Sequence, residues 1–549
     1  SQRRNQKVVE ECPAPNLSPD LRAALQATAE RLLSSVAYRN AGTVEFILDA
    51  DSGEYYFLEV NTRLQVEHGV TEEVYGIDLV EWMVRLAAGE EPALESRRAT
   101  LSPRGHALQV RLYAEDPYLN FQPAPGLLSH VDWPELPGLR IDHWIAAGTE
   151  VAPFFDPMLA KLITHAADRP AALERMRSAL DKTRIYGSVT NLDYLRALLD
   201  DPVLARGEVT TRYLNDFAWR PARIDVLQGG TQTSIQEWPG RRGFWHVGIP
   251  PSGPFDGYSF RLGNRLLGNP DGLAGLEITL QGPTLKFSAA TEIVIAGAEI
   301  DATLDGEPVG MWQRLAIAAG QTLALGKMRG QGTRAYLLVA GGLDCPAYLG
   351  SRSTFTLGQL GGHNGRALRN GDVLRWCEPA SGVQQPDELP SDLLPQFPET
   401  REIRVVYGPH GAPDFFTDSD IETFFATAWE VHYNSSRTGI RLIGPRPAWA
   451  RPDGGEAGLH PSNIHDNAYA FGTIDFTGDM PVILGPDGPS LGGFVCPATV
   501  IHADLWMLGQ LRAGDRVRFV PVSLQTAVAL EAARNDELAS LAKADIDLS

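Results

Sequence analysis

The sequence contains little cysteine, little lysine and no long apolar run. Four cysteines occur in 549 residues, at positions 12, 345, 377 and 496, and this wide spacing forms neither a zinc motif nor a disulfide framework. Sparse cysteine is typical of proteins of the reducing cytoplasm, and we expect that location. No apolar stretch reaches the ~20 residues that a membrane helix needs. These shortages exclude a disulfide-stabilised scaffold and a helical membrane protein.

The charge balance excludes two classes of partner. The chain has 48 Lys and Arg against 68 Asp and Glu, a net charge of -20, and no basic tract. An acidic protein of this kind is a poor candidate for binding nucleic acid or an anionic membrane. The 43% hydrophobic and 21% charged composition is that of an ordinary globular protein. At roughly 150 residues per domain, the length corresponds to about four domains.

The character of the sequence changes near residue 220. Before it, helical and β patterns alternate: we expect helices from Ser18 to residues 40–42 and over 79–88, 171–182 and 191–199, and β runs over 44–48 and 55–60. After it, short β-rich runs separated by Gly, Pro, Asp and Asn predict barrels or sandwiches. A linker is predicted over 382–398, and a helical tail from about residue 525. The fold class is multidomain, with an α+β part followed by a mostly-β part.

The two β runs near the N-terminus predict a hairpin that sets two carboxylates opposite each other. If the turn is centred on Ser52, Glu45 faces Glu59 and Ile47 faces Phe57. Opposed like charges destabilise a sheet, and a divalent cation bound to both carboxylates and to a phosphate would remove that repulsion. If the strand continues, residues 59, 61, 63, 65 and 67 share one face and offer metal ligands, a guanidinium and a general base. A solvated polar face of an antiparallel sheet explains the same spacing equally well.

Four stretches of the first 220 residues resemble the ATP-grasp biotin carboxylase family. Residues 2–7 read Gln-Arg-Arg-Asn-Gln-Lys and residues 59–68 read Glu-Val-Asn-Thr-Arg-Leu-Gln-Val-Glu-His. Residues 111–116 read Arg-Leu-Tyr-Ala-Glu-Asp, and residues 121–126 read Phe-Gln-Pro-Ala-Pro-Gly. The matches occur in family order over about 215 residues. The resemblance implies the C-terminal half of an ATP-grasp domain over 1–104 and a biotin carboxylase C-terminal domain over 105–220.

The resemblance also implies a role for each matching residue. Residues at ATP-binding positions are Gln2, Asn5, Gln6, Lys7, Glu45 and Glu59. Residues at the positions of ligands for Mg²⁺ or Mn²⁺ are Glu45, Glu59 and Asn61. Residues that match the bicarbonate cradle are Arg63, Gln65 and Val66. Glu67 matches the base that deprotonates bicarbonate, and Arg111 matches the arginine that stabilises the biotin enolate, so Glu67, Arg63 and Arg111 form the implied catalytic set.

The β half carries a second resemblance. Its landmarks are residues 225–237, 248–256, 276–283 and 340–342. They resemble the carboxyltransferase family that also includes components of 5-oxoprolinase and of allophanate hydrolase, which implies a pair of cyclophilin-like β-barrels. The implied pieces are a first β subdomain over 224–395, a second over 400–523, and a helical tail or linker over 524–549. Residues 458–469 and 485–493 look like the urea carboxylase version of the family.

A carboxyltransferase pocket must bind a small polar molecule and deprotonate a weakly nucleophilic nitrogen, for which Asp, Asn and His are suitable. The candidate residues are Asp256, Arg437, His460, Asn463, His465, Asp466, Asn467 and Asp487. Other interpretations stay open at this point. Residues 252–256 also fit a Gly-Pro turn, residues 434–437 also fit a helix cap or a sheet-edge partner, and the two histidines also fit structural roles.

The resemblances together imply an ATP- and biotin-dependent urea carboxylase that makes allophanate from urea and bicarbonate. Guanidine is the nearest alternative substrate. An ATP-dependent hydrolase of the 5-oxoprolinase type and a catalytically silent interaction module are alternatives from other classes. The biotin carboxylase motifs argue against the hydrolase, and the presence of Glu67 and Arg111 argues against the silent module.

The small number of lysines excludes a biotin attachment site in this sequence. Biotin carriers use an Ala-Met-Lys-Met type loop, and the only Lys-Met here is Lys327-Met328. The first residue is Ser, and no glycine-rich ATP-grasp lid is present. We therefore expect the biotinyl carrier and the second carboxyltransferase half outside this chain, which would be an internal fragment, inactive alone and open to homodimer formation.

Overall fold

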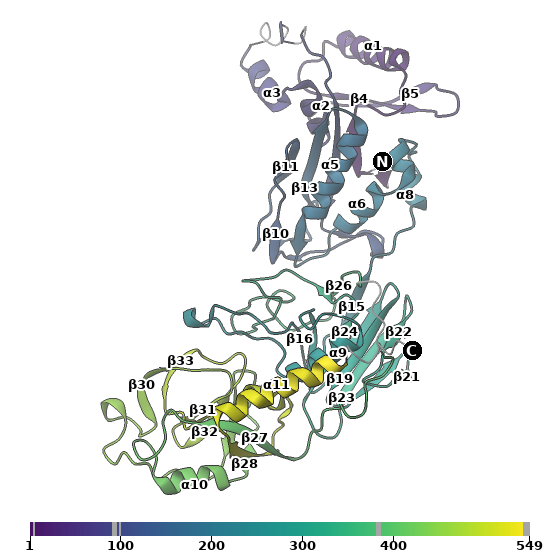
Figure 1. The fold of residues 1–549 in the computed structure, drawn as a ribbon. Coiled ribbons are helices and arrows are strands. Elements are labelled where there is room, and N and C mark those ends of the chain that lie inside the picture. Colours follow the sequence, from purple (N-terminus) through teal and green to yellow (C-terminus); the bar gives the residue numbers. More distant parts are fainter. Residues whose placement is uncertain (4–5, 91–95, 98–99, 380–385, 542–549) are drawn as a thin grey trace. The chain divides into compact units, whose positions relative to one another are not determined.

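The computed structural model describes residues 1–3, 6–90, 96–97, 100–379 and 386–541 (Figure 1). The contacts divide the chain into two compact units, Ser1–Pro221 and Ala222–Ser549, and each is described by itself. Among the described residues, no helix is long and apolar enough to cross a membrane.

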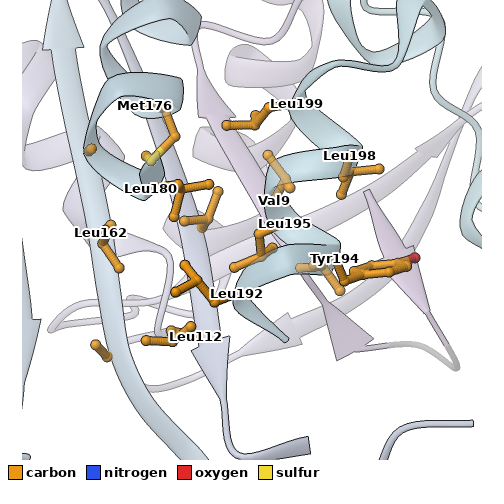
Figure 2. Close-up of a cluster of buried hydrophobic side chains, with 14 of the residues drawn as sticks. Val9, Leu112, Leu162, Met176, Leu180, Leu192, Tyr194, Leu195, Leu198 and Leu199 are labelled. Atoms are coloured by element: carbon orange, nitrogen blue, oxygen red, sulfur yellow. The ribbon is translucent and has the colours of Figure 1, made fainter. Parts of the chain in front are cut away.

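A four-stranded antiparallel sheet organises the first unit. Its strand order is β11 (Leu139–His143), β13 (Met158–Ala166), β6 (His106–Tyr113) and β3 (Val9–Cys12). Side chains alternate between the two faces of a strand. Leu108, Val110 and Leu112 of β6 therefore enter the buried core, while Gln109 and Arg111 face the other way. Helices α5 (Arg169–Lys182) and α6 (Leu192–Leu199) complete this core (Figure 2).

Helix α2 (His68–Tyr75) covers the opposite face of the same sheet. Val70 and Val74 pack against Ala107 of β6 and Ile163 of β13. The absence of a side chain at Gly69 permits this close approach, because a Cβ there would lie 2.4 Å from the Ile163 Cδ1 atom. The polar residues of β6 therefore lie on the face that α2 approaches.

The predicted hairpin forms as strands β4 (Thr43–Leu48) and β5 (Tyr55–Asn61). Helix α3 (Leu79–Ala87) agrees with the predicted helix over 79–88. Helix α1 (Pro19–Ser35) ends earlier than predicted, because Ala37 and Asn40 have positive φ angles of 50° and 101° that stop the helix. The short elements of this unit are β1 (Gln2–Arg3), β2 (Gln6–Lys7), β7 (Glu115–Asp116), β8 (Gln122–Pro123), β9 (Gly126–Leu127), β10 (His130–Asp132), β12 (Glu150–Val151), β14 (Arg184–Tyr186), α7 (Pro202–Arg206) and α8 (Tyr213–Asp216).

The second unit begins with two β-sheets that share one hydrophobic core. The first sheet has the order β21 (Glu307–Pro308), β20 (Ile300–Leu304), β23 (Thr322–Met328), β18 (Thr284–Phe287), β15 (Arg223–Gln228), β26 (Val373–Trp376) and β25 (Leu343–Asp344). The second has the order β16 (Gln232–Gln236), β17 (Gly275–Thr279), β24 (Arg334–Val339), β19 (Thr291–Gly297) and β22 (Leu315–Ile317). Helix α9 (Gly257–Leu266) packs on β19 and β24.

A closed barrel of seven strands follows. Its order is β27 (Thr400–Tyr407), β34 (Ala498–Val500), β31 (Thr473–Thr477), β32 (Met480–Leu484), β29 (Gly439–Ile443), β28 (Trp429–Val431) and β35 (Arg516–Pro521). Helix α10 (Asp418–Ala426) packs beside β35, and strands β30 (Asn463–Ala468) and β33 (Leu491–Phe494) form a separate pair. The predicted tail helix is confirmed as α11 (Leu524–Ser540), which contacts η4 (His502–Gln510). The part of the predicted linker that is described, 386–398, forms no strand or helix, and its Leu389 and Leu393 are buried.

Candidate functional site

The hairpin of the first unit brings two carboxylates together. Glu45 and Glu59 are cross-strand partners, as the turn position predicted. The pairing of Ile47 with Phe57 was wrong: a bulge between Glu45 and Phe46 shifts the strands by one residue, so Ile47 faces Tyr56. The two carboxylates therefore remain opposed at the end of the hairpin nearest Asn61.

Hydrogen-bond donors converge on the Oε1 atom of Glu45. The Nδ2 atom of Asn61 lies 3.0 Å from Glu45 Oε1 and 3.0 Å from Glu59 Oε1, so one amide bridges both carboxylates. The same oxygen of Glu45 accepts from Gln65 Nε2 at 2.8 Å and from Lys7 Nζ at 3.1 Å. The bond from Gln65 is the largest cause that lowers the pKa of Glu45, and Lys7 acts in the same direction. This carboxyl group is therefore held in its ionised form.

Glu67 occupies the centre of the site. Its Oε1 atom accepts a hydrogen bond from Lys7 Nζ, and its Oε2 atom lies 3.0 Å from Arg111 NH2. Burial opposes the charge of Lys7, but the bonds to Glu67 and Glu45 outweigh burial and raise the pKa of Lys7. Glu67 is also the N-cap residue of α2, where the helix dipole favours an anion. Two cations and a helix terminus thus surround one carboxylate.

Arg111 is held on its other side by Glu10. Its Nε atom donates to Glu10 Oε1 at 2.6 Å, and its side chain is almost fully buried. Burial raises the pKa of Glu10 even though Arg111 acts against this effect. The guanidinium is therefore fixed between Glu10 and Glu67 and cannot rotate freely.

The strand carrying these residues is shorter than predicted. Strand β5 ends at Asn61, and residues 65–67 form a turn before α2 instead of continuing one extended face. The turn still brings Gln65 and Glu67 to Glu45 and Lys7, because each makes a hydrogen bond within that cluster. The Oε1 atom of Gln65 is buried and has no hydrogen-bond partner among the described residues. It is therefore a buried acceptor whose hydrogen-bonding capacity is not used by the described residues.

The remaining predicted residues of this site lie at its edge. Arg63 is exposed, and its NH1 atom donates to the carbonyl of Leu64 at 3.3 Å. Gln2 pairs with Lys7 in the β1–β2 ribbon, and Gln6 interacts with the hydroxyl of Tyr113. Asn5 lies outside the described residues.

Sequence reasoning missed three buried residues beneath this cluster, namely Glu10, Gln109 and Lys161. Lys161 Nζ donates to the carbonyl oxygen of Val66 at 3.2 Å, and Gln109 Nε2 lies 3.4 Å from the same oxygen. Gln109 also donates to Glu10 Oε2 at 3.2 Å. A detectable signal existed, since Lys161 and Gln109 are isolated polar residues within apolar strand sequences, where a polar side chain needs a partner.

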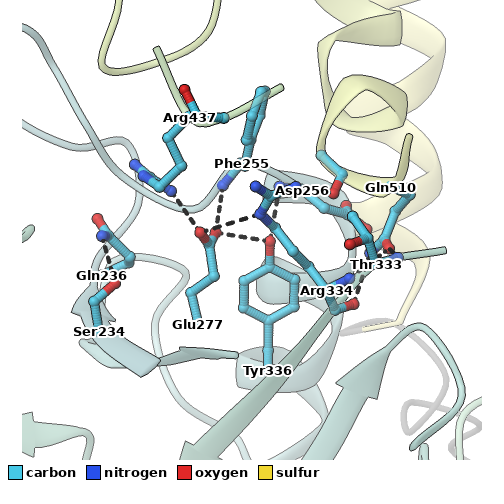
Figure 3. A network of polar contacts seen from close by, with 12 residues as sticks. Ser234, Gln236, Phe255, Asp256, Glu277, Thr333, Arg334, Tyr336, Arg437 and Gln510 are labelled. Atoms are coloured by element: carbon cyan, nitrogen blue, oxygen red, sulfur yellow. Dashed lines mark hydrogen bonds and ion pairs between the residues drawn. The ribbon is translucent and has the colours of Figure 1, made fainter. Parts of the chain in front are cut away.

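In the second unit, Arg437 lies in a buried ionic cluster with Glu277 (Figure 3), and Asp487 is its other carboxylate partner. The guanidinium of Arg437 contacts Asp487 Oδ2 at 2.8 Å, Glu277 Oε1 at 2.5 Å and the carbonyl of Gly253 at 2.8 Å. These partners raise the pKa of Arg437 although burial acts against them. The side chain of Arg437 therefore neither caps a helix nor pairs with a sheet edge. It joins the barrel to the preceding sheets.

The ionic cluster fixes the loop at residues 252–256. Glu277 Oε2 accepts from the Phe255 N–H at 2.7 Å, and Asp256 caps α9 through the Ser259 N–H at 2.9 Å. Burial raises the pKa of Asp256 to about 6. Ser252 has a φ of 55°, and its buried hydroxyl has no partner among the described residues. Ser252 and Phe255 line a cavity of about 120 Å³, so the loop is a turn and also a cavity wall.

The five other predicted pocket residues lie along the β30 segment. They are His460, Asn463, His465, Asp466 and Asn467. His460 contacts Asp479 through Nε2 at 3.3 Å and Ser462 through Nδ1 at 3.0 Å, while His465 and Asp466 are exposed. Among the described residues, Arg437, Asp487 and Asp256 therefore belong to one buried cluster. The five other predicted pocket residues lie outside that cluster.

Comparisons with known protein families match three consecutive stretches of the chain. Residues 1–94 match the family described as carbamoyl-phosphate synthase L chain, ATP binding domain. Residues 109–216 match the biotin carboxylase C-terminal domain. Residues 247–521 match the carboxyltransferase domain, subdomain A and B.

Relatives that match nearly the whole chain are named as enzymes acting on urea. The urea amidolyase of Saccharomyces cerevisiae is 49% identical over 545 residues, which are 98% of this chain and 29% of the yeast protein. A putative urea carboxylase of Emericella nidulans is 46% identical over 95% of this chain and 43% of its own length. The crystal structure of the Kluyveromyces lactis urea carboxylase superposes with a TM-score of 0.91 at 48% identity, covering 98% of this chain and 48% of that one. This chain thus spans less than half of each of these proteins.

The match to the carboxyltransferase profile extends over half of the chain, and the buried cluster around Arg437 lies inside it. The chain belongs to the family of carboxyltransferase domains, subdomain A and B.

Proposed function

We propose that this chain is part of an ATP- and biotin-dependent urea carboxylase, a ligase that forms allophanate, ADP and phosphate from urea, bicarbonate and ATP. One observation carries the proposal: Glu67 is held between Lys7 and Arg111 at the N-terminus of α2. The relatives named urea amidolyase and urea carboxylase support the choice of substrate.

The first unit supplies the residues for activating bicarbonate. Glu67 accepts the proton of bicarbonate, and the oxygen so freed attacks the γ-phosphorus of ATP, releasing ADP. The carboxyphosphate that forms breaks down to phosphate and CO₂ beside the N1′ atom of biotin. Lys7 and Arg111 hold the carboxylate of Glu67 in place for this proton transfer.

Arg111 has a second task in this proposal. When the biotinyl group is bound, it would supply the N1′ nitrogen that takes up CO₂, and negative charge would develop on its ring oxygen. A guanidinium that is already fixed by Glu10 can stabilise that charge without reorganising, which a mobile side chain or water could not do. Arg63, at the exposed edge of the site, would complete the bicarbonate cradle with Gln65 and Val66.

The donor set near the hairpin fits a magnesium or manganese ion. Glu45, Glu59 and Asn61 offer oxygen ligands, which both ions prefer, and the two opposed carboxylates gain from a cation between them. Asn61 would present its oxygen after a rotation of its amide, since the two orientations have the same shape. When bound, the ion supplies charge neutralisation for the phosphates of ATP. Gln2, Asn5, Gln6 and Lys7 would contact the nucleotide.

The second unit would transfer the carboxyl group from carboxybiotin to a nitrogen of urea. Deprotonation of that nitrogen needs a base, and the small cavity beside Ser252 and Phe255 is lined by the loop that Arg437 and Glu277 fix. We propose Asp256, Arg437 and Asp487 as supports of this loop. We propose His460 and the β30 residues Asn463, His465, Asp466 and Asn467 as contacts for a ligand or for the second carboxyltransferase half. The closed barrel and the preceding sheets would be cyclophilin-like.

The proposal requires partners beyond the sequence given. No biotin attachment loop occurs in it, so the biotin would arrive on a carrier domain and a second carboxyltransferase half would complete the transfer site. We also propose a cytoplasmic enzyme, since all four cysteines are free thiols, and a homodimer.

Substitution Glu67→Gln in the complete enzyme tests this function. We expect bicarbonate-dependent ADP release to be abolished while ATP still binds, because the amide cannot take a proton. Turnover is measured with urea and with guanidine as acceptors. Unchanged ADP release by Glu67→Gln would show that Glu67 is not the base. Turnover of the unsubstituted enzyme with guanidine but not with urea would identify guanidine as the substrate.

A further inference from the structure

A row of charged side chains crosses the sheet of the first unit beneath the site. Asp142 of β11, Lys161 of β13 and Arg111 of β6 are successive cross-strand partners. Strands β13 and β6 are otherwise largely apolar, and Lys161 and Arg111 are each only 8% exposed. Two cations directly opposite each other destabilise a sheet. This pair therefore needs compensation or a purpose.

Compensation comes from both ends of the row. Lys161 Nζ lies 3.1 Å from Asp142 Oδ2, and Arg111 is paired with Glu10 and Glu67. Burial opposes the charge of Asp142, but hydrogen bonds from Arg140 and Lys161 lower its pKa. Each cation is thus matched by its own carboxylate. As far as the stability of the sheet is concerned, an apolar residue at position 161 together with an uncharged one at 142 would serve equally well.

The remaining contact of Lys161 points to a purpose. Its ammonium group donates to the carbonyl oxygen of Val66 at 3.2 Å, the residue directly before Glu67. Because the peptide group is planar, fixing that carbonyl also fixes the N–H and the Cα atom of Glu67. Together with Gln109, which lies 3.4 Å from the same oxygen, the ammonium therefore fixes the peptide plane from which Glu67 leaves the backbone.

The same row also holds the helix that follows. Arg140 forms two bonds of 2.9 Å with the carboxylate of Asp142, and its NH1 atom contacts Glu72 Oε2 of α2 at 2.7 Å. Glu67 is thus tied to the sheet before it, through Val66, and after it, through Glu72. Asp142 contacts the cation of each connection, Lys161 and Arg140.

We propose that Lys161 is a positioning residue for bicarbonate activation, acting through the Val66 carbonyl to orient Glu67. The inference rests on the proposed function. A hydrogen bond from a charged donor contributes about 1.5–3 kcal/mol, so its loss at the bicarbonate cradle corresponds to an increase of about 10- to 150-fold in the KM for bicarbonate. ATP contacts other residues, so the KM for MgATP stays within about twofold.

The test compares Lys161→Met, Lys161→Arg and Lys182→Met in the complete carboxylase. Lys182 is an exposed lysine at the end of α5 and serves as the matched control. ADP release is measured against bicarbonate and MgATP, and the melting temperature is measured for each protein. We expect Lys161→Met to raise the bicarbonate KM more than tenfold, Lys161→Arg to recover most of that loss, and Lys182→Met to change nothing.

Several outcomes separate the two proposals. A wild-type enzyme without bicarbonate-dependent ADP release contradicts the proposed function itself. If the wild-type enzyme is active and the bicarbonate KM of Lys161→Met lies within twofold of the wild-type value, the proposed role of Lys161 is overturned. A rise in the KM for MgATP as large as the rise in the KM for bicarbonate also overturns it. If Lys161→Met does not fold, the shorter neutral variant Lys161→Gln replaces it under the same criteria.

Discussion

The buried cluster around Arg437 gives a stability prediction that the structure makes quantitative. Substitution Arg437→Met keeps much of the side-chain volume but removes the partner of Glu277 and Asp487 and a donor to the Gly253 carbonyl. Breaking a buried ion pair by removing one member costs about 3–5 kcal/mol. For a domain of this size each kcal/mol lowers the melting temperature by about 2–4 °C, which gives a decrease of roughly 6–20 °C.

Calorimetry of the chain with and without the substitution measures this decrease. The matched control is Arg329→Met, which removes an exposed ion pair with Asp301 and should leave the melting temperature unchanged. The pH dependence provides a second criterion. Burial opposes the charge of Glu277, but Arg437 and Arg334 outweigh it and lower the pKa of Glu277, so the stability that Arg437 provides is present at neutral pH and lost as the pH falls through that pKa. A melting temperature for Arg437→Met no lower than that of Arg329→Met would refute the reasoning.

Two further predictions concern single carboxyl groups. Burial raises the pKa of Asp256 to about 6, above its unfolded value, so this group makes the protein more stable as the pH falls from 7 to 5. Asp256→Asn should remove this gain in stability, which is measured as the change in melting temperature between pH 7 and pH 5. An unchanged pH profile of the melting temperature would show that Asp256 does not titrate in this range. Glu45→Gln should raise the Mg²⁺ concentration that half-saturates ADP release by about tenfold, because an amide is a weaker ligand than a carboxylate. An unaltered Mg²⁺ titration would exclude Glu45 as a ligand.

Local sequence patterns predicted the hairpin but not its details. The position of the turn was sufficient to pair Glu45 with Glu59. The bulge after Glu45 and the end of β5 at Asn61 were not predictable, because alternating polar residues fit an extended strand as well as the turn that carries Gln65 to Glu45. Local backbone angles decided these points, and no side-chain pattern encodes them.

Contacts between distant residues were beyond the reach of spacing arguments. Arg437 and Glu277 are 160 residues apart, and neither neighbourhood indicates that they meet. Asp occurs both on β30 and in the buried cluster, so residue type alone could not separate the two groups. Lys161 was conspicuous only as a charge within an apolar run, and its partner Val66 contributes a backbone atom that no residue type reveals.

Strand β6 combines two tasks in one stretch of eight residues. Its even-numbered members Leu108, Val110 and Leu112 fill the core, and its odd-numbered members Gln109 and Arg111 contact Val66, Glu10 and Glu67 of the candidate site. Inserting or deleting a single residue in the middle of this strand would exchange the two faces of the part that follows, turning leucines toward the carboxylates and the guanidinium into the core. The core and the site would then be lost together. The strand can therefore change by replacement of residues but not by a change in its length, which makes its middle a poor place for a natural or engineered insertion.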